Sequence, residues 1–337
     1  MNRKVSIIGA GNFGTCLAQQ LATNGHHPIM WARDAQIVST INTQHYNRRH
    51  LREIKLHKNI TATSNAKNGI TSSDFLILAI PTQSLRLVLK ELKPYIKKSQ
   101  LVICAAKGIE MNTMALPSQI IEQELGKSIS HKSSFLSGPS FAIEVAHGQP
   151  TAVTIASSNK TSALMVQNLF HSPNFRAYTS SDHIGIEIAG ALKNVIAIAV
   201  SASAGLGFQA NTQAALITRG LAEITRLGSA LGASPLTFTG LGGVGDLLLT
   251  CSSVKSRNYT VGYKLGKGEK LKDIVSSLGS VAEGVATAKS AYQLANKLKV
   301  RASIISAVYQ VLYDQKPIKE VVYELMNSAA REELEGI

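Results

Sequence analysis

The chain of 337 residues has 45% hydrophobic and 17% charged side chains and a formal net charge of +14. This length allows two domains with separate cores, and the hydrophobic fraction is ordinary for a globular protein. The cysteines at 16, 104 and 251 are spaced too widely for a disulfide framework or a zinc motif. No uncharged apolar stretch reaches the roughly 20 residues that span a bilayer. We therefore expect a cytoplasmic protein with no metal site and no membrane insertion.

The first predicted elements are a buried strand over residues 4–8, a glycine-rich loop and a helix that stops at Asn24-Gly25. The loop, Gly9-Ala-Gly-Asn-Phe-Gly14, has the strand and the helix that a dinucleotide fingerprint requires. Gly9 permits the tight turn, Gly11 lets the backbone approach a pyrophosphate, and Gly14 lets the helix pack closely on the strand. The pattern predicts that NAD or NADP binds at Gly9, Gly11, Asn12 and Gly14.

A second strand over residues 29–32 ends at Arg33-Asp34, where a dinucleotide ribose usually binds. An acidic residue there binds the ribose 2′-hydroxyl, whereas an arginine favours a 2′-phosphate. Asp34 equally fits the N-cap of a helix that begins at Ala35. Arg33 therefore predicts that NADP is accepted alongside NAD.

Part of the positive charge lies in a basic segment, residues 45–58, that includes Arg48, Arg49, Arg52, Lys55 and Lys58. Such a segment can be a nucleic-acid or membrane patch, a solvated loop, or part of a field that attracts small anions. The histidines in it follow no metal-ligand spacing, and no RNA-binding signature or helix-turn-helix pattern accompanies it. We favour the last two interpretations, expect anionic ligands and expect no nucleic-acid partner.

Further strands are predicted over residues 74–80, 101–105, 135–137, 151–156 and 175–178. We therefore expect the first half of the chain to form a mostly parallel sheet. Lys107 follows one of them, and ligands bind at strand carboxyl ends in such sheets. It is placed to meet an anion, although a solvated lysine fits as well. Gly138-Pro-Ser140 reads as a tight turn into a helix, whose N–H groups and Ser140 hydroxyl can face a ligand. Pro139 and Ser140 are also ordinary helix-start residues.

Helical patterns replace strand patterns after about residue 181, over 182–204, 213–231, 283–298 and 303–312. We therefore predict a Rossmann-type α/β domain over residues 1–180, followed by an all-α domain over 181–337. The second domain would carry the substrate and catalytic groups.

Lys193 lies at the centre of the most apolar helical pattern, residues 184–200. Its neighbours at helical spacing include Ile186, Ala189, Ile196 and Val200. Burial there lowers a lysine pKa toward neutrality, which suits a proton acceptor near pH 7. A lysine that reaches solvent from the helix edge, or one neutralised in a structural ion pair, fits the same pattern.

Two later segments also carry candidate groups. Asp246 ends a run with four glycines, Gly240-Leu-Gly-Gly-Val-Gly245, which allows close backbone approach to a ligand. A capping aspartate at a helix start is the alternative. Ser256 is a plausible N-cap, and Arg257 in the first turn would make that helix end a phosphate site.

Taken together, these segments resemble the bacterial NAD(P)-dependent glycerol-3-phosphate dehydrogenases along essentially the whole chain. The motifs that carry the resemblance occur in the family's order, and they are Gly9–Gly14, Trp31-Ala-Arg33, Ala105-Ala-Lys107-Gly-Ile-Glu110, Leu136-Ser-Gly-Pro-Ser-Phe-Ala142, Ala191-Leu-Lys193-Asn194-Val, Gly242-Gly-Val-Gly-Asp246-Leu, Lys255-Ser-Arg257-Asn258 and Val281-Ala-Glu283-Gly284.

The resemblance implies hydride transfer between NAD(P)H and dihydroxyacetone phosphate, which gives sn-glycerol 3-phosphate for phospholipid synthesis. Lys193 would be the proton acceptor, Lys107 would touch both cofactor and substrate, and Asp246 would orient the ammonium group or offset its burial. The implied substrate-site residues are Lys107, Gly138, Ser140, Lys193, Asp246, Ser256, Arg257 and Asn258. The implied dinucleotide contacts, besides the loop glycines and Asn12, are Phe13, Arg33, Lys107, Ala142, Arg257, Val281 and Glu283.

Two other functions stay open at this point. One is a two-domain dehydrogenase for a hydroxy acid, a sugar acid or an acyl-CoA, which would need a carboxylate or CoA clamp instead of a phosphate clamp. The other is a dinucleotide-sensing protein that binds nucleic acid through the basic segment, which leaves Lys193 and Asp246 unexplained. The sequence also permits a homodimer.

Overall fold

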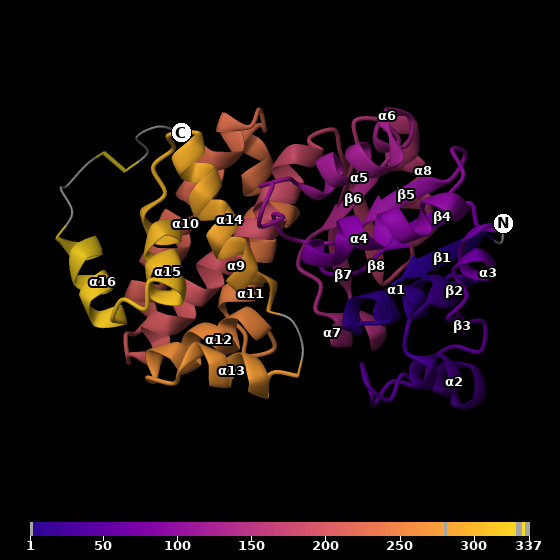
Figure 1. Cartoon of the computed structure of the whole chain (residues 1–337), viewed down its shortest axis with the longest axis horizontal. Helices are drawn as coiled ribbons and strands as arrows, with labels where there is room; N and C mark the ends of the chain where they lie inside the picture. Colours follow the sequence, from indigo (N-terminus) through magenta and orange to yellow (C-terminus); the bar gives the residue numbers. More distant parts are fainter. Residues whose placement is uncertain (1–2, 280–281, 328–331, 334–337) are drawn as a thin grey trace. The chain divides into compact units, whose positions relative to one another are not determined.

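The computed structural model describes residues 3–279, 282–327 and 332–333. These residues divide into two compact units, unit 1 over 3–106 and 117–183 and unit 2 over 107–116 and the described residues from 184 onward. Figure 1 shows strands and helices in unit 1 and helices in unit 2. The fold class is the predicted one, a Rossmann-type sheet domain followed by a helical region.

Unit 1 is built on one eight-stranded sheet in the order β3-β2-β1-β4-β5-β6-β7-β8. All neighbouring strands are parallel except β6 and β7, which pair antiparallel. The strand order reverses direction between β1 and β4, which is where ligands bind in open α/β sheets. The strands are β1 (Lys4–Ile8), β2 (His27–Trp31), β3 (Thr61–Thr63), β4 (Phe75–Leu78), β5 (Leu101–Cys104), β6 (Ser134–Ser137), β7 (Thr151–Ala156) and β8 (Phe175–Ser180).

Helices connect these strands and cover the sheet, as expected for parallel strands that are buried on both faces. Every residue of β4, β5 and β6 is buried, and Ile7, Met30 and Ile77 belong to the hydrophobic core of this unit. The helices are α1 (Asn12–Thr23), α2 (Ala35–Gln44), α3 (Ala66–Ile70), α4 (Thr82–Leu92), η1 (Lys93–Tyr95), α5 (Pro117–Leu125), α6 (Lys127–Ser130), α7 (Ala142–Ala146) and α8 (Lys160–Phe170).

Unit 2 is helical among the residues that the structure describes. Its elements are α9 (His183–Gly205), α10 (Ala210–Ala230), η2 (Pro235–Thr239), η3 (Leu241–Gly245), α11 (Asp246–Cys251), α12 (Arg257–Gly266), α13 (Leu271–Ser277), α14 (Glu283–Lys297), α15 (Ser303–Tyr313) and α16 (Ile318–Met326). Helix α9 is the centre of the core, where its Ile188, Leu192 and Val195 are fully buried.

By length and hydropathy α9 resembles a membrane span, but 89% of its most apolar window is buried inside the structure. It therefore has the burial of a core helix. Glycines at 205, 262 and 266 allow the backbones of α9 and α12 to approach closely, because a Cβ at any of them would collide with the facing helix. This contact sets Lys193 and Arg257 on helices that pack together.

The short segment Lys107–Leu116 belongs to unit 2, although it follows β5 in the chain. The prediction that places residues 1–180 in one domain does not include this excursion. Ile109 is fully buried and Leu116 nearly so, and both lie in the core of unit 2. The hydroxyl of Ser290 on α14 also donates a hydrogen bond to the carbonyl of Ile109, at 2.9 Å. These contacts fix the start of the segment, where Lys107 stands.

Candidate active site

Three charged groups meet in the interior of unit 2. The carboxylate of Asp246, at the start of α11, accepts hydrogen bonds from the ammonium groups of Lys193 and Lys107. Lys107 Nζ lies 2.7 Å from one oxygen, and Lys193 Nζ bonds to the other. Asp246 is thus engaged by two lysines and does not cap α11, which was the alternative for this residue. The cluster carries a formal charge of +1.

Burial makes this cluster chemically unusual. The side chains of Asp246 and Lys193 are 1% and 9% exposed, and that of Lys107 is 18% exposed. Desolvation lowers the pKa of Lys193 to about 8, although the attraction of Asp246 opposes the shift. For Asp246 burial acts against ionisation, but the two lysines outweigh it and its pKa is lowered. Lys193 therefore does not reach solvent from the helix edge, as one interpretation of the sequence proposed.

A network of amide side chains joins the three helices around this cluster. Asn258 on α12 donates to the side-chain oxygen of Asn194 at 2.9 Å, and it accepts from the backbone N–H of Gly284 at 3.0 Å. A Cβ at Gly284 would lie 2.7 Å from both the Asn194 carbonyl and the Asn258 side chain. Asn194 follows Lys193, so this network holds α9, α12 and α14 in one arrangement. Asn258, predicted to line the substrate site, thus also has structural contacts.

The start of α12 has the features of an anion site. The hydroxyl of Ser256 accepts from the backbone N–H of Tyr259 at 3.3 Å and caps the helix. Arg257 is the first helical residue, its side chain is exposed, and its charge interacts with that of Glu283 at the start of α14. Val281, another predicted dinucleotide contact, lies outside the described residues.

The glycine-rich loop of unit 1 has the geometry that its sequence predicts. Gly9 has φ of +109°, and a Cβ at Gly14 would collide with the Gly9 carbonyl. A Cβ at Gly11 would meet no atom within 4 Å, so space is open above the backbone there. No side chain caps the N-terminus of α1 at Asn12 and Phe13. This helix end without a side-chain cap and the open backbone fit a pyrophosphate group, so these residues can hold a dinucleotide.

Two other predicted positions lie in unit 1. The hydroxyl of Ser140 donates to the Gly138 carbonyl at 2.9 Å, in the turn that leads to α7. Ala142 is the first residue of that helix. At the end of β2, Arg33 forms an exposed ion pair with Glu91 at 3.0 Å, and Asp34 caps α2 through the N–H groups of Gln36 and Ile37.

Comparison with known proteins shows the family to which the chain belongs. Residues 4–163 match the N-terminal part of the NAD-dependent glycerol-3-phosphate dehydrogenase family, and residues 182–323 match its C-terminal part. The chain belongs to this family. It is 47% identical over 326 residues to glycerol-3-phosphate dehydrogenase [NAD(P)+] of Geobacter sulfurreducens, covering 97% of each chain. It is 44% identical over 335 residues to that of Bacillus velezensis, covering 99% of this chain and 97% of the other.

A solved family structure has the same fold. The glycerol-3-phosphate dehydrogenase of Coxiella burnetii superposes with a TM-score of 0.92 at 32% sequence identity, over 97% of this chain and 99% of that one. The resemblance inferred from the motifs is therefore confirmed for the family.

One residue of the cluster in this family member was not among the sequence-based candidates. The hydroxyl of Thr250 accepts from Lys193 Nζ at 2.9 Å and donates to the backbone carbonyl of Asp246 at 2.7 Å. Thr250 lies four residues after Asp246, one helical turn along α11, and this spacing is the signal that could have found it. It is 4% exposed, so the Lys193 ammonium has two buried acceptors.

Proposed function

We propose that the protein is an NAD(P)-dependent glycerol-3-phosphate dehydrogenase, which interconverts dihydroxyacetone phosphate and sn-glycerol 3-phosphate by hydride transfer. In this role it supplies glycerol phosphate for phospholipid synthesis in the cytoplasm. Family membership and the names of the relatives support the reaction, and three free, buried cysteines are in keeping with a reducing compartment.

The observation that carries the proposal is the buried cluster of Lys107, Asp246 and Lys193. Reduction of a ketone places negative charge on its oxygen as the hydride arrives. Two ammonium groups around one carboxylate leave a net positive charge in a site of low polarity, where electrostatic stabilisation is stronger than in water. The cluster therefore suits an oxygen that becomes an alkoxide.

Lys193 would move the proton. In the reducing direction its ammonium form polarises the ketone and donates a proton to the forming alkoxide. In the oxidising direction the neutral amine of Lys193 removes the hydroxyl proton. A pKa of about 8 makes this neutral form available near neutral pH. Asp246 and Thr250 accept two of its hydrogen bonds and would leave the third N–H to point at substrate. Lys107 would stabilise the same oxygen.

The substrate phosphate would bind at the start of α12, with Ser256 and Arg257. An arginine beside a helix N-terminus offers a planar fork of donors to phosphate oxygens. Binding energy from the phosphate would position C2 of the substrate for the reaction. Gly138 and Ser140 are further proposed substrate contacts, and Asn258 would orient the first turn of α12.

The cofactor would be held in unit 1 by Gly9, Gly11, Asn12, Phe13 and Gly14, because a helix end without a side-chain cap fits its pyrophosphate. When bound, the nicotinamide group supplies or accepts the hydride. Arg33, Lys107, Ala142, Arg257, Val281 and Glu283 remain proposed contacts of the dinucleotide. The family assignment favours this function over the hydroxy-acid and nucleic-acid alternatives.

The test is the oxidation of NADPH, and in parallel of NADH, with dihydroxyacetone phosphate as the acceptor. Unphosphorylated dihydroxyacetone and a 2-keto acid serve as matched acceptors. We expect turnover with the phosphorylated ketone and a kcat/KM for it that exceeds those of the others by at least about a hundredfold, because a phosphate clamp contributes several kcal/mol. Equal use of the keto acid, or no turnover by folded protein, would contradict the proposal. Sedimentation of the same protein distinguishes a monomer from the homodimer that the sequence permits.

A further inference from the structure

The basic segment is not a loose surface loop. Asn47, which is fully buried, donates to the carbonyl of Ala10 and to the hydroxyl of Thr15, both at 2.9 Å. Its side-chain oxygen accepts from the backbone N–H groups of Arg49 and His50, at 3.3 and 3.1 Å. The amide nitrogen of Asn47 thus joins this segment to the glycine-rich loop and to α1, and the amide oxygen fixes the backbone of Arg49 and His50.

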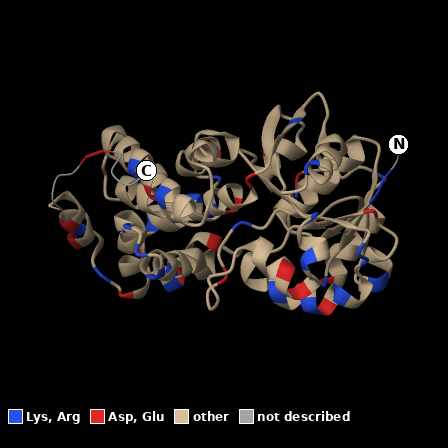
Figure 2. Ribbon diagram, turned by 90° about the horizontal axis from the view of Figure 1, so that it is seen from above, with Lys and Arg blue, Asp and Glu red and all other residues tan. Residues whose placement is uncertain are grey.

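Other contacts hold the far end of the segment to the same helix. The backbone N–H of His57 donates to the side chain of Gln19 on α1 at 2.8 Å. Ile54 and Leu56 lie in the core of unit 1, and Leu51 packs against it. The segment is therefore a fixed strap along α1, whose charged residues have defined positions. Figure 2 shows that Lys and Arg occur over both units, so this strap is not simply the place where the positive charge collects.

The strap places Arg49 beside Asp34, at the position where an acidic residue usually binds the ribose of a dinucleotide. Arg49 Nη1 lies 3.1 Å from one carboxylate oxygen of Asp34, at the end of β2. The other oxygen of Asp34 accepts from the backbone N–H groups of Gln36 and Ile37. Three of the roughly four acceptor positions of this carboxylate are thus occupied, which leaves Asp34 little capacity to bind a ribose 2′-hydroxyl. Its ion pair with Arg49 also reduces the repulsion that a phosphate would meet.

We propose that Arg49, positioned by Asn47, binds the cofactor 2′-phosphate together with Arg33 and biases this enzyme toward NADP. The proposal rests on the proposed function for the identity of the cofactor. One guanidinium nitrogen of Arg49 is paired with Asp34, and its other N–H groups have no partner among the described residues. They are free to bind phosphate oxygens in the bidentate manner of arginine.

The neighbouring arginine provides a matched control. Arg48 has the same charge and is also exposed, but it lies over the ring of Tyr46 at 4.2 Å and bonds to Gln44. A general electrostatic field would respond equally to Arg48→Gln and Arg49→Gln, whereas a specific phosphate contact responds only to the second.

The experiment measures binding of 2′,5′-ADP and of 5′-AMP to the full-length protein by calorimetry, at fixed ionic strength and without substrate. We expect Arg49→Gln to weaken 2′,5′-ADP by about tenfold, the effect of one charge-assisted contact, and to change 5′-AMP by less than about twofold. Arg48→Gln should leave both affinities within about twofold. Equal effects of the two variants, or equal losses for the two ligands, would overturn the proposal.

A double-mutant cycle tests the role of Asn47. The Asn47→Ala variant should bind 2′,5′-ADP much more weakly than the wild type, because Arg49 is no longer held in place. Adding Arg49→Gln to this variant should then reduce the affinity little further. Additive losses in a folded double variant would contradict the anchoring role. If Asn47→Ala does not fold, the Arg49 and Arg48 variants decide the question alone. Loss of ketone turnover with Arg49-dependent 2′,5′-ADP binding intact would count against the proposed function and not against this inference.

Discussion

Lys193 and Asp246 are 53 residues apart in the chain and form an ion pair inside unit 2. Such a pair contributes little to stability on balance, because both charges lose their hydration. Its value lies in the chemistry that a lysine with a lowered pKa can perform.

Replacing Lys193 by methionine should lower kcat by at least about a hundredfold, because it removes the proposed proton donor while keeping the side-chain volume. Binding of NADPH, measured by fluorescence, should remain within about threefold, because no cofactor contact is proposed for Lys193. Lys289→Met, which removes a lysine that lies over Tyr313 in the same unit, is the matched control. Near-normal turnover in the Lys193 variant would refute its role.

The two directions of the reaction should respond oppositely to pH. Oxidation of glycerol phosphate needs neutral Lys193, so its kcat/KM should rise as pH increases through about 8. Reduction of dihydroxyacetone phosphate needs the ammonium form, so its kcat/KM should fall over the same range. Initial rates between pH 6 and 10 with both substrates measure this. Parallel profiles in the two directions would exclude Lys193 as the titrating group.

Thr250→Val should shift the midpoint of these profiles to lower pH. The substitution removes an acceptor at 2.9 Å from the Lys193 ammonium, so the charged form loses stabilisation and the pKa of Lys193 falls further. We expect kcat for reduction to fall by about tenfold at neutral pH. Thr250→Ser keeps the hydroxyl and should restore both midpoint and rate. An unchanged midpoint in the valine variant would show that Thr250 has only a packing role.

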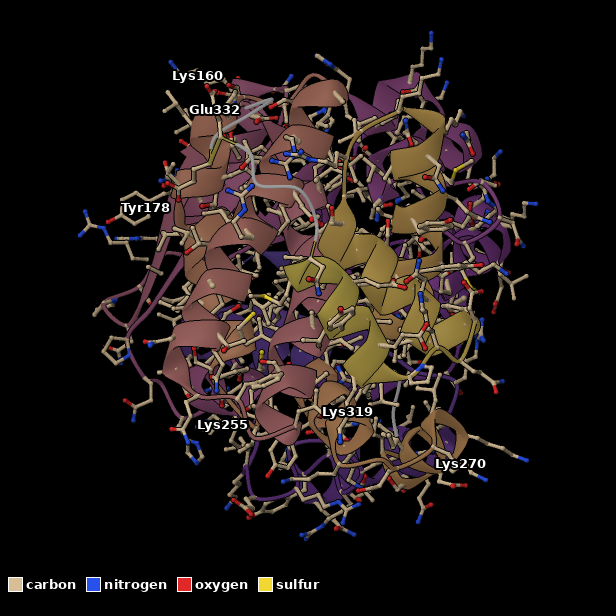
Figure 3. The ribbon with its side chains drawn as sticks, turned by 90° about the vertical axis from the view of Figure 1, so that its left-hand side faces the viewer. Lys160, Tyr178, Lys255, Lys270, Lys319 and Glu332 are labelled. Carbon is tan, nitrogen blue, oxygen red and sulfur yellow. The ribbon has the colours of Figure 1, made fainter. Side chains whose placement is uncertain are left out.

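Arg257→Ala should mainly weaken substrate binding. Loss of a charge-assisted phosphate contact should raise KM for dihydroxyacetone phosphate by about tenfold or more, with little effect on unphosphorylated dihydroxyacetone. Lys270→Ala is the control. Lys270 is exposed, it directly precedes α13, and its side chain points away from the helices in Figure 3. An unchanged KM for the phosphorylated ketone would exclude Arg257 as the clamp.

Glu223 should make stability depend on pH. This buried carboxyl on α10 accepts from the N–H groups of Ile304 and Ile305, at the start of α15, at 2.8 and 3.1 Å. Burial raises its pKa from 4.5 to about 7, so the folded state holds its proton more tightly than the unfolded state. Its contribution is thus fully present below about pH 4.5 and is lost as pH rises toward 7.

The comparison that isolates this effect is Glu223→Gln, which cannot ionise. Denaturant unfolding at several pH values measures the free energy of unfolding of both proteins. The difference in favour of the wild type should decrease as pH rises from 4.5 to 7. Arg226 on the same helix lowers the pKa of folded Glu223, so Arg226→Gln should raise the upper end of this pH window and leave its lower end unchanged. An advantage that stays constant with pH would contradict the buried titration.

The sequence by itself determined the features that depend on local pattern. The glycine-rich loop, with a strand before it and a helix after it, predicts the dinucleotide-binding turn because each glycine answers a steric need. The apolar surroundings of Lys193 predict its burial, since α9 has no polar face. Most strands and the longest helices were predicted, but the three-residue β3 and helices α3, α5, α6, α8, α13 and α16 were not, because short or weakly periodic segments carry little signal.

Only the tertiary structure decided how distant groups combine. Hydrophobic periodicity says which face of a helix is buried but not which residue it meets, so the pairing of Asp246 with both Lys193 and Lys107 could not be read from the chain. Core contacts of Ile109 and Leu116 place Lys107–Leu116 in unit 2, against its position in the sequence. Likewise, the bond of Asn47 to Ala10 turns a basic segment into a strap beside the glycine-rich loop, because a buried amide must satisfy its hydrogen bonds wherever partners exist.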